Sequence, residues 1–518
     1  MKYSTETFLP ANSDTMLTGF LKGRWTASMA AVLSGALLTC AYPPVYLGFL
    51  AYIALVPLLA IAHLNPVRKT FALTYVAGLT FLGSSLFWIY YSTWVGMIIA
   101  ILVLSVFFAV PFALTAYIRR THPRLALFVF PFAFSSVEWL RSFDQLAFPW
   151  MILGNSQTSY PHLIQFADIT SVYGVSCWIA VINIIIFMLF IKRSVSRFAA
   201  LALLFVVPAA YSYFVINSGY GGERTVTVSL IQGNVSPLEK WRIGLEEWNI
   251  KLYAALSEEA KVSGPDLIIW PETAIPTYFA DIPSYREMVR AKIDSLGIPV
   301  LTGLPSIDFA TEETWNSAAL LVPGKRDIRR YDKIHLVPFG EAFPLDNHLK
   351  FLRDIDFGQA NWNEGHETVV YSVEGLPPFS PAICFESIFP DLIRSFVVAG
   401  SQLLVIITND VWFAPVVAPE QHAMIAVMRA VEFHRPVARC ANLGISLFID
   451  QYGRITKQTR INERTILTDT LTTNDSMTFY ARFGNVFSVA ATIITLISAA
   501  GAYFTRKSAS ASTDGYCE

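Results

Sequence analysis

The sequence predicts an α-helical membrane bundle of about eight spans, with one α/β domain inserted before the last span. The first indication is composition: 54% of the 518 residues are hydrophobic and 15% are charged, with a mean hydropathy of +0.46. Soluble proteins carry about 25% charged residues. The second is distribution, because long apolar runs fill residues 25–215, whereas residues 216–482 have the mixture of a globular domain. The third is an alternation of basic residues between the connections.

Eight apolar runs are candidates for spans, since about 20 apolar residues cross the hydrocarbon core of a bilayer as a helix. They are 25–41, 46–62, 71–90, 94–118, 125–140, 171–191, 198–215 and 484–504. The first, second and fifth are short, so tilted, re-entrant or interfacial helices are the alternative there.

Basic residues mark every second connection, counted from the N-terminus. They are Lys22 and Arg24; Arg68 and Lys69; Arg119, Arg120 and Arg124; Lys192, Arg193 and Arg197; and Arg506 and Lys507. The opposite short connections hold almost none, with Arg141 as the exception. Basic loops stay in the cytoplasm. We therefore expect a multi-pass protein of the cell inner (plasma) membrane with both termini cytoplasmic, and eight spans rather than seven, which would break the alternation.

These patterns predict five regions. They are a cytoplasmic segment 1–24, spans 1–7 within 25–215, a periplasmic domain 216–482, span 8 at 484–504 and a cytoplasmic tail 505–518.

The connection 141–170 is long and aromatic. Because Trp and Tyr are common at membrane interfaces, an interfacial belt is the first interpretation of Trp150 and Tyr160, and a rim for lipid entry is the second. Glu138 and Arg141 stand three residues apart at the end of the fifth span, which predicts a structural ion pair.

Short β-rich runs alternate with helical patterns in the insert, which indicates an α/β layered domain. The expected strands are Thr225–Ile231, Asp266–Trp270, Pro299–Gly303, Ser317–Val322, Ala382–Phe385, Leu403–Thr408 and Ser446–Ile449. The expected helices lie at about 238–260, 284–296, 390–398 and 420–434. A domain of this length can bury a core of its own.

Composition also excludes some function classes. The net charge of −1 and the lack of a face dense in Lys and Arg argue against nucleic-acid binding. The five cysteines form no CxxC or His/Cys cluster, so no metal is expected. A disulfide between Cys384 and Cys440 is an alternative in an oxidising compartment, but both lie inside strand-like runs.

Three segments of the insert place reactive residues at strand ends. Glu272 follows the run that ends at Pro271, and Cys384 ends an apolar strand. The polar segment 331–341 keeps Lys333 and Glu341 close in sequence.

A Cys, a Lys and a Glu can together perform acyl transfer without a metal or cofactor. A free thiol has a pKa near 8.5, a carboxylate can take its proton on attack, and an ammonium favours the thiolate and stabilises the oxyanion. Taken singly, each residue has a commoner structural interpretation: Cys384 as core, Glu272 as a loop carboxylate and Lys333 as a solvated cation. The sequence has no Gly-x-Ser-x-Gly elbow, which disfavours a Ser-His-Asp hydrolase.

These segments resemble the nitrilase (carbon–nitrogen hydrolase) superfamily, which has a Glu–Lys–Cys triad on an α-β-β-α sandwich. Such a domain between the last two spans is similar to the apolipoprotein N-acyltransferase family, and the resemblance covers nearly the whole chain. It includes Glu138–Arg141, Phe148–Trp150, Gln232–Asn234, Thr408–Asp410 with Trp412 and Phe413, and Arg429–Ala430 with Glu432. Phe385 and Ala414 depart from the family, which commonly has Tyr and Gly there.

The resemblance implies that Glu272 is the general base, Lys333 the oxyanion stabiliser and Cys384 the nucleophile. Glu341 and Glu386 match family carboxylates that support the triad.

The resemblance also implies a substrate pocket with two aromatic walls. Trp241 matches a tryptophan in a mobile loop over the pocket, and Trp412 and Phe413 match the opposite wall.

The implied reaction moves an acyl chain from a phospholipid, typically phosphatidylethanolamine, to Cys384 as a thioester. The chain then passes to the α-amino group of the diacylglyceryl-cysteine of an apolipoprotein, with no cofactor. The alternatives are a membrane-tethered amidase or nitrilase that hydrolyses small amides, and a non-catalytic membrane scaffold with a nitrilase-like domain.

Overall fold

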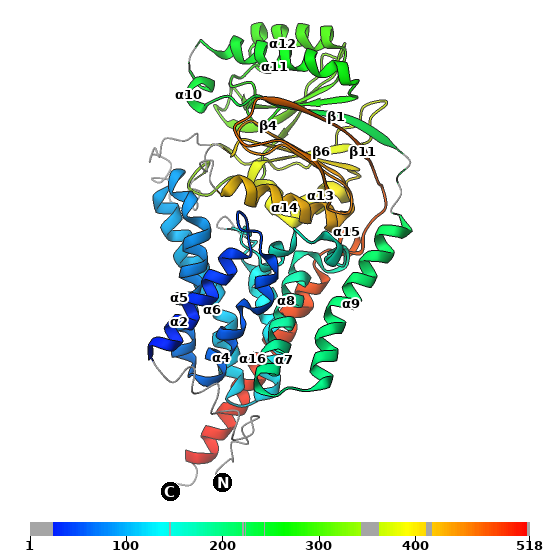
Figure 1. Ribbon diagram of the computed structural model, residues 1–518. Coiled ribbons are helices and arrows are strands. Elements are labelled where there is room, and N and C mark those ends of the chain that lie inside the picture. Colours follow the sequence, from blue (N-terminus) through cyan, green and yellow to red (C-terminus); the bar gives the residue numbers. More distant parts are fainter. Residues whose placement is uncertain are drawn as a thin grey trace. The chain divides into compact units, whose positions relative to one another are not determined.

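The computed structural model describes residues 24–143, 147–219, 222, 224–242, 244–342, 362–410 and 417–514. Contacts divide the chain into two compact units, both drawn in Figure 1. Of the described residues, the helical unit holds those up to 87, those within 97–212 and those from 485 onward, and the α/β unit holds 88–96 and those within 213–484.

Apolar helices form the helical unit. They are α2 (Arg24–Cys40), α3 (Ala51–Ala54), α4 (Val56–Leu64), α5 (Val67–Leu86), α6 (Trp94–Arg119), α7 (Pro123–Leu140), α8 (Ala167–Ile191), α9 (Val195–Ser218) and α16 (Val486–Asp514). Short 3-10 helices join them: η1 (Gly48–Leu50), η2 (Phe87–Tyr91), η3 (Leu153–Gln157) and η4 (Pro161–Leu163).

Among the described residues, five helical stretches are long and apolar enough to cross a membrane. They are Val67–Tyr91, Trp94–Arg119, Ala167–Ile191, Val195–Ser218 and Val486–Ser508. The three short expected spans coincide with shorter elements: α2, the stretch from η1 to α4, and the 18-residue α7. The chain is therefore a membrane protein, with about eight apolar helical segments.

The second expected span is interrupted rather than continuous. Pro57 stands in the first turn of α4 and has no N–H for a bond to the preceding turn. Asn183 of α8 satisfies the freed groups: its Nδ2 donates to the carbonyl of Ala51 (2.8 Å), and its Oδ1 accepts from the N–H of Leu55 (2.9 Å). Backbone groups in lipid need such internal partners, so this polar side chain stabilises the break.

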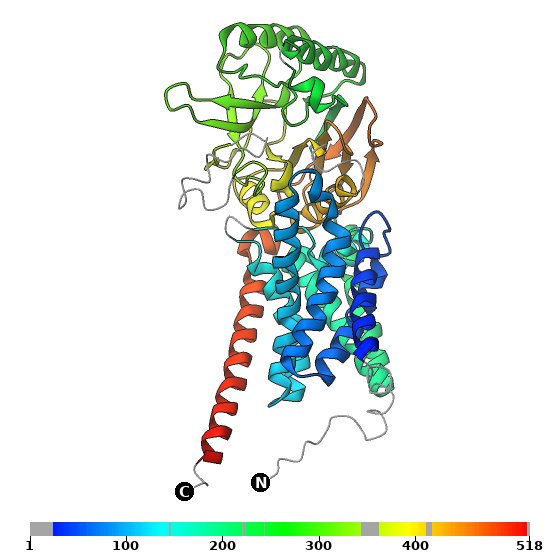
Figure 2. The same cartoon turned by 90° about the vertical axis from the view of Figure 1, so that its left-hand side faces the viewer.

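Two glycines allow helices of the unit to pack closely, as small residues do in membranes. A Cβ on Gly35 of α2 would lie 2.6 Å from the carbonyl oxygen of Ala77 in α5. A Cβ on Gly78 of α5 would lie 3.1 Å from the Cα of Ser105 in α6. The close pair α5 and α6 runs side by side in Figure 2.

Two sheets form the centre of the α/β unit. Their strands are β1 (Thr225–Gln232), β2 (Leu267–Ile269), β3 (Val300–Ile307), β4 (Thr314–Leu321), β5 (Arg329–Asp332), β6 (Phe379–Ile383), β7 (Leu403–Thr408), β8 (Val437–Ala441), β9 (Leu447–Ile449), β10 (Ile455–Gln458) and β11 (Thr465–Thr472). The six-stranded sheet has the order β11-β1-β2-β3-β4-β5, and the five-stranded sheet has the order β10-β9-β8-β7-β6.

Helices cover the outer face of each sheet (Figure 1). α11 (Glu246–Ala260) and α12 (Pro283–Leu296) pack on the six-stranded sheet, where Tyr253, Val289 and Ile293 join the fully buried Trp270 in one apolar core. α13 (Pro390–Val398) and α14 (Ala418–Phe433) cover the five-stranded sheet, and α15 (Phe479–Phe483) packs beside them. The expected α-β-β-α sandwich is confirmed.

All seven expected strands are present: Leu403–Thr408 has the expected ends, and the ends of the other six are shifted. Four strands, β5, β8, β10 and β11, are not among the expected ones. β10 is fully exposed and β11 is only partly buried, so no apolar run marks either of these two. β5 is short and polar, whereas β8 is fully buried and was missed although it is apolar at most positions. The expected helix 238–260 is two helices, α10 (Pro237–Lys240) and α11, and Gly244 between them has a φ of +89° that a helix excludes.

Residues 88–96 belong to the α/β unit although they connect two helices of the other unit. Within the α/β unit, the indole N–H of Trp88 donates to Oε1 of Gln421 in α14 (3.2 Å).

Candidate active site

Glu272, Lys333 and Cys384 follow β2, β5 and β6, so one sandwich brings together residues from three distant parts of the chain. All three side chains are buried, with Lys333 fully enclosed. The Cys384 thiol is close enough to the other two for both charges to act on its pKa. Each residue is thus presented by the end of a strand whose position the sheet fixes.

Lys333 lies between two carboxylates. Its Nζ is 2.8 Å from Oε1 of Glu341 and 3.7 Å from Oε1 of Glu272. Burial by itself lowers the pKa of Lys333, but Glu341 and Glu272 outweigh it and hold that pKa above its usual range. The side chain is therefore a permanent cation at neutral pH.

Asn316 of β4 orients the two carboxylates. Its Nδ2 donates to Oε1 of Glu272 (2.8 Å) and to Oε1 of Glu341 (3.2 Å). Sequence reasoning missed Asn316, which stands just before an expected strand and gains its role only from the pairing of β3, β4 and β5.

One oxygen of Glu272 is left for chemistry. Its Oε2 is buried and has no hydrogen-bond partner among the described residues. Burial raises the pKa of Glu272, the Lys333 ammonium lowers it, and Glu341 raises it again, with a net increase. A carboxylate with a raised pKa and a free oxygen is suited to take a proton.

Cys384 begins a short 3-10 helix, η7 (Cys384–Ile388), directly after β6. Its φ is +52°, a left-handed conformation that residues other than glycine rarely adopt. Burial and the nearby Glu272 raise the pKa of the thiol well above its usual value, against the opposing effect of Lys333. The Cys384 side chain is therefore a neutral thiol at rest, and it would need a base to become a nucleophile.

Cys440 does not pair with Cys384. Both cysteines are free in the structure. The Cys440 thiol lies between the sheets and contacts the main-chain oxygens of Ile231 (3.5 Å) and Ile269 (3.3 Å). The sequence-based preference for free thiols, over a disulfide between Cys384 and Cys440, is therefore confirmed.

Glu386 joins the segment of Lys333 to the segment of Cys384. Its Oε1 accepts hydrogen bonds from Tyr331 Oη (2.6 Å), from the N–H of Ile334 (2.6 Å) and from the N–H of His335 (3.2 Å). Its Oε2 accepts from the N–H of Ile383 (2.7 Å). Burial raises the pKa of Glu386 to about 7, against the effect of these donors. The side chain thus fixes two strand ends to each other.

A second buried network contacts the main chain of Cys384. Asp410 Oδ2 accepts from Arg439 Nη2 (2.8 Å), and Asp410 Oδ1 lies 3.0 Å from His422 Nδ1. His422 Nε2 lies 2.9 Å from Ser387 Oγ and 3.0 Å from the main-chain oxygen of Cys384. Ser387, His422 and Asp410 thus have the connectivity of a Ser-His-Asp triad, which sequence reasoning did not find. Ser387 is fully buried and its hydroxyl also donates to the Cys384 carbonyl (3.0 Å), so its place is structural.

Cys384, Asp410 and His422 are close enough to hold a metal ion by distance, since one ligand atom from each lies within 4.8 Å of the others. The Arg439 guanidinium already occupies one oxygen of Asp410 and repels a second cation. The donor set is therefore a poor fit to a metal.

Of the three predicted wall residues, Trp241 directly follows α10 and is 43% exposed. Trp412 and Phe413 lie outside the described residues.

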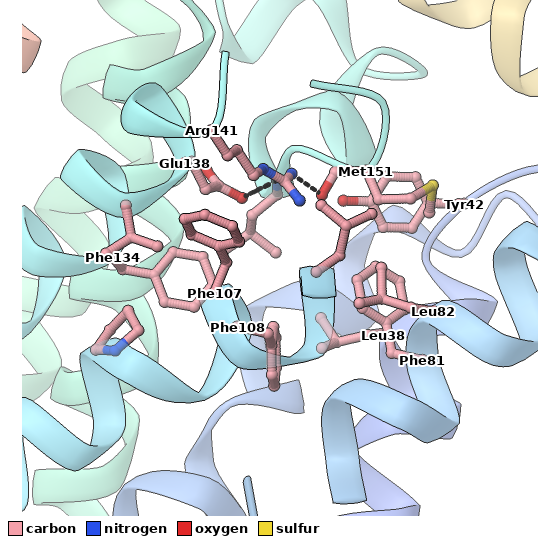
Figure 3. Close-up of a pocket in the computed structure, with 14 residues that line it drawn as sticks. Leu38, Tyr42, Phe81, Leu82, Phe107, Phe108, Phe134, Glu138, Arg141 and Met151 are labelled. Carbon is pink, nitrogen blue, oxygen red and sulfur yellow. Dashed lines mark hydrogen bonds and ion pairs between the residues drawn. The ribbon is translucent and has the colours of Figure 1, made fainter. Parts of the chain in front are cut away.

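The helical unit has a pocket of its own (Figure 3), lined by apolar side chains of α2, α5, α6 and α7 around Glu138 and Arg141. The two charged groups lie 3.9 Å apart and are buried, as expected for a structural ion pair. Arg141 Nη2 donates to the carbonyl of Met151 (2.6 Å), and Glu138 Oε1 accepts from the N–H of Leu153 (2.7 Å). The pair therefore anchors the connection that follows α7.

Trp150 in that connection does not belong to an exposed aromatic belt. It is 1% exposed and stacks on Phe148, with ring centroids 5.9 Å apart.

Comparisons with known proteins match both parts of the chain. A family model described as Apolipoprotein N-acyltransferase N-terminal domain matches residues 34–185, and one described as Carbon-nitrogen hydrolase matches residues 227–478. The Apolipoprotein N-acyltransferase of Geobacter metallireducens is 36% identical over 501 residues, which cover 93% of this chain and 96% of the relative. That of Chlorobaculum tepidum is 33% identical over 486 residues, which cover 87% and 91%. Among solved structures, Saccharomyces cerevisiae Nit3 of the nitrilase superfamily matches 48% of this chain and 91% of its own, with 18% identity and a TM-score of 0.39.

Proposed function

The chain belongs to the apolipoprotein N-acyltransferase family, and we propose that it transfers an acyl chain from a phospholipid to the α-amino group of a lipoprotein's diacylglyceryl-cysteine, through a thioester on Cys384. The observation that carries this proposal is the free Oε2 of Glu272 in one buried site with Lys333 and the Cys384 thiol. The substrates are inferred from the family, and the thioester mechanism is inferred from these three side chains.

The first step loads the enzyme. Glu272 takes the thiol proton as the Cys384 sulfur attacks the ester carbonyl of the phospholipid, which becomes a tetrahedral oxyanion. The Lys333 ammonium stabilises the negative charge that develops there. The C–O bond then breaks, Glu272 returns the proton to the departing alkoxide, and a lysophospholipid leaves an acyl-Cys384 thioester.

The second step transfers the acyl chain from Cys384 to the lipoprotein. The lipoprotein amine attacks the thioester carbonyl, and Glu272 takes a proton from the nitrogen. The C–S bond breaks, and the sulfur receives that proton as the thiol is regenerated. An amide is more stable than a thioester, so this direction is favourable.

Burial suits this two-step exchange. The thioester must survive until the acceptor arrives, and a site that excludes water slows its hydrolysis. Cys384 is 4% exposed and Glu272 is 5% exposed.

Membrane helices explain how both substrates meet one thiol, because a phospholipid and a diacylglyceryl protein are both anchored in a bilayer. Restriction to the same surface raises their encounter rate. We place the protein in the inner membrane with residues 216–482 periplasmic and both termini cytoplasmic, on the alternation of basic residues. We also propose phosphatidylethanolamine as the usual donor.

The test is mass spectrometry of the purified full-length protein in lipid nanodiscs. Incubation with phosphatidylethanolamine should add one acyl mass to Cys384, and the adduct should persist until a diacylglyceryl peptide with a free amine is added. Cys384→Ala should gain no mass.

Two other outcomes are informative. Rapid loss of the acyl mass to water without acceptor would support a membrane-tethered amidase or hydrolase. Full lipoprotein acylation by Cys384→Ala would support the scaffold hypothesis. Nanodiscs of phosphatidylglycerol or phosphatidylcholine test the donor.

A further inference from the structure

A buried lysine lies behind Glu272, outside the residues considered so far. Lys240 ends α10 and is 2% exposed. Its Nζ donates to the main-chain oxygen of Glu272 (2.9 Å) and to Oγ1 of Thr273 (2.5 Å). Burying a lysine is unfavourable unless its donors are satisfied. The contacts to Glu272 and Thr273 satisfy two of these donors at the turn that presents Glu272.

That turn is strained. Thr273 has a φ of +46°, and β-branched residues rarely adopt this left-handed conformation. The turn also presses against β3, because a Cβ on Gly303 would lie 2.5 Å from the nitrogen of Thr273. Strained backbone persists only where its surroundings determine it. Two of the determining contacts come from Lys240.

The same lysine belongs to the segment that carries Trp241. The start of this segment is fixed at Val235, whose N–H donates to Oδ1 of Asn442 (3.0 Å) and whose carbonyl accepts from Nδ2 of Asn442 (2.9 Å). Its end is fixed where the Lys240 side chain reaches the turn. The exposed Trp241 follows at once.

We propose that Lys240 is a positioning residue that holds the Glu272 turn in the conformation required of the general base, and that ties the Trp241 segment to that turn. It acts through Glu272 and touches no reacting atom, and the inference rests on the base role proposed above. Because one side chain makes both connections, the position of the Trp241 segment and the orientation of the Glu272 base are then coupled.

The contacts do not depend on the charge of the lysine. Burial lowers the pKa of Lys240 to about 7, against the opposing effect of the Glu272 carboxylate. An ammonium has three donors and a neutral amine has two. Both forms therefore supply the two hydrogen bonds that the turn receives.

The test measures alkylation of Cys384 by iodoacetamide in the full-length protein, because this reaction reports removal of the thiol proton and needs no lipid. Lys240→Met keeps the length of the side chain and removes its donors. We expect it to slow alkylation by about tenfold or more, a fraction of what a general base contributes. In a Glu272→Gln background, the same change should alter the rate by less than twofold.

Lys251→Met is the matched control, since Lys251 is an exposed lysine on α11 paired with Glu247 (2.7 Å). It should alkylate at the parent rate. An unchanged alkylation rate in Lys240→Met would overturn the proposal. A rate lowered by the same factor with and without Glu272→Gln would also overturn it, because a general structural defect slows alkylation whether or not Glu272 is present.

A second variant keeps the test decisive if Lys240→Met does not fold. Thr273→Val removes one acceptor of the lysine and keeps the shape of the side chain, and it is measured in the same two backgrounds with the same criteria. Failure of the wild type to form acyl-Cys384 from phospholipid would reject the proposed function instead. The alkylation rates would still decide the role of Lys240.

Discussion

The Nζ of Lys333 lies 3.7 Å from Oε1 of Glu272, and both side chains are buried. The contact is long for a hydrogen bond, and the shorter one, at 2.8 Å, goes to Glu341. Lys333 thus gives its strongest contact to a supporting carboxylate. The Oε2 of Glu272 remains without a partner among the described residues. In the proposed mechanism, this division of contacts leaves Oε2 of Glu272 available to take the thiol proton while Lys333 remains charged for the oxyanion.

Glu272→Gln should abolish most acyl-enzyme formation. The amide keeps the size of the side chain but cannot take the thiol proton, and general bases contribute roughly 100- to 10,000-fold. The measurement is the rate of acyl-Cys384 formation from phospholipid by mass spectrometry. Glu312→Gln, a change in an exposed loop, is the control. A Glu272→Gln protein that acylates at more than a tenth of the parent rate would contradict the base assignment.

Cys384→Ser should form no thioester and no detectable acyl-enzyme, because a hydroxyl is a far poorer nucleophile than a thiol at neutral pH. Cys440→Ala should be tolerated, since the hydrogen bonds of this thiol to the described residues go to the main-chain oxygens of Ile231 and Ile269. Mass spectrometry and lipopeptide acylation check both. Normal turnover by Cys384→Ser would refute the nucleophile assignment.

Strand ends were the most predictable part of the site. Apolar runs that stop at a polar residue placed Glu272 and Cys384 after β2 and β6, because strands are marked by local composition. The partners that orient these residues were not predictable in the same way. Asn316 and His422 sit inside an ordinary strand and an ordinary helix, and their roles arise from pairing between distant segments.

The helical unit shows the same limit. Hydropathy identified the apolar segments, but it carries no information on where a helix is interrupted. The break between α3 and α4 depends on Asn183, more than 120 positions away along the chain. The fully exposed β10 and the partly buried β11 were missed because pairing, rather than burial, holds them in the sheets.

Tyr331→Phe should destabilise the α/β unit and slow acylation. It removes the 2.6 Å hydrogen bond from the phenol to Glu386, which joins the segments of Lys333 and Cys384. A hydrogen bond within a protein contributes about 0.5–1.5 kcal/mol to its stability. Thermal unfolding in detergent should show a lower Tm than the parent. An unchanged Tm would mean that the other donors to Glu386 suffice.

As pH falls, the acylation rate should decline at a pH above the ordinary pKa range of a glutamate. Burial raises the pKa of Glu272, and acylation is lost as pH falls through that raised pKa because the protonated base cannot accept the thiol proton. Glu341→Gln removes a negative charge that raises this pKa, so this decline should move to lower pH. Rates of acyl-Cys384 formation between pH 4 and pH 9 measure the shift, and a move to higher pH would contradict it.

His422 gives the sharpest test of the network that contacts Cys384, because its two nitrogens contact different groups. His422→Asn places an amide nitrogen near the position of Nδ1, within reach of Asp410, but is too short to reach the Cys384 carbonyl. His422→Gln extends an amide toward the position of Nε2 and the Cys384 carbonyl. If the contact to the nucleophile's backbone matters, Gln should retain several-fold more acylation than Asn. His434→Gln is the control, since this buried histidine contacts the main-chain oxygen of Gln451 (3.0 Å) instead. Equal losses in the Asn and Gln variants would show that the network stabilises the fold without holding Cys384 in its left-handed conformation.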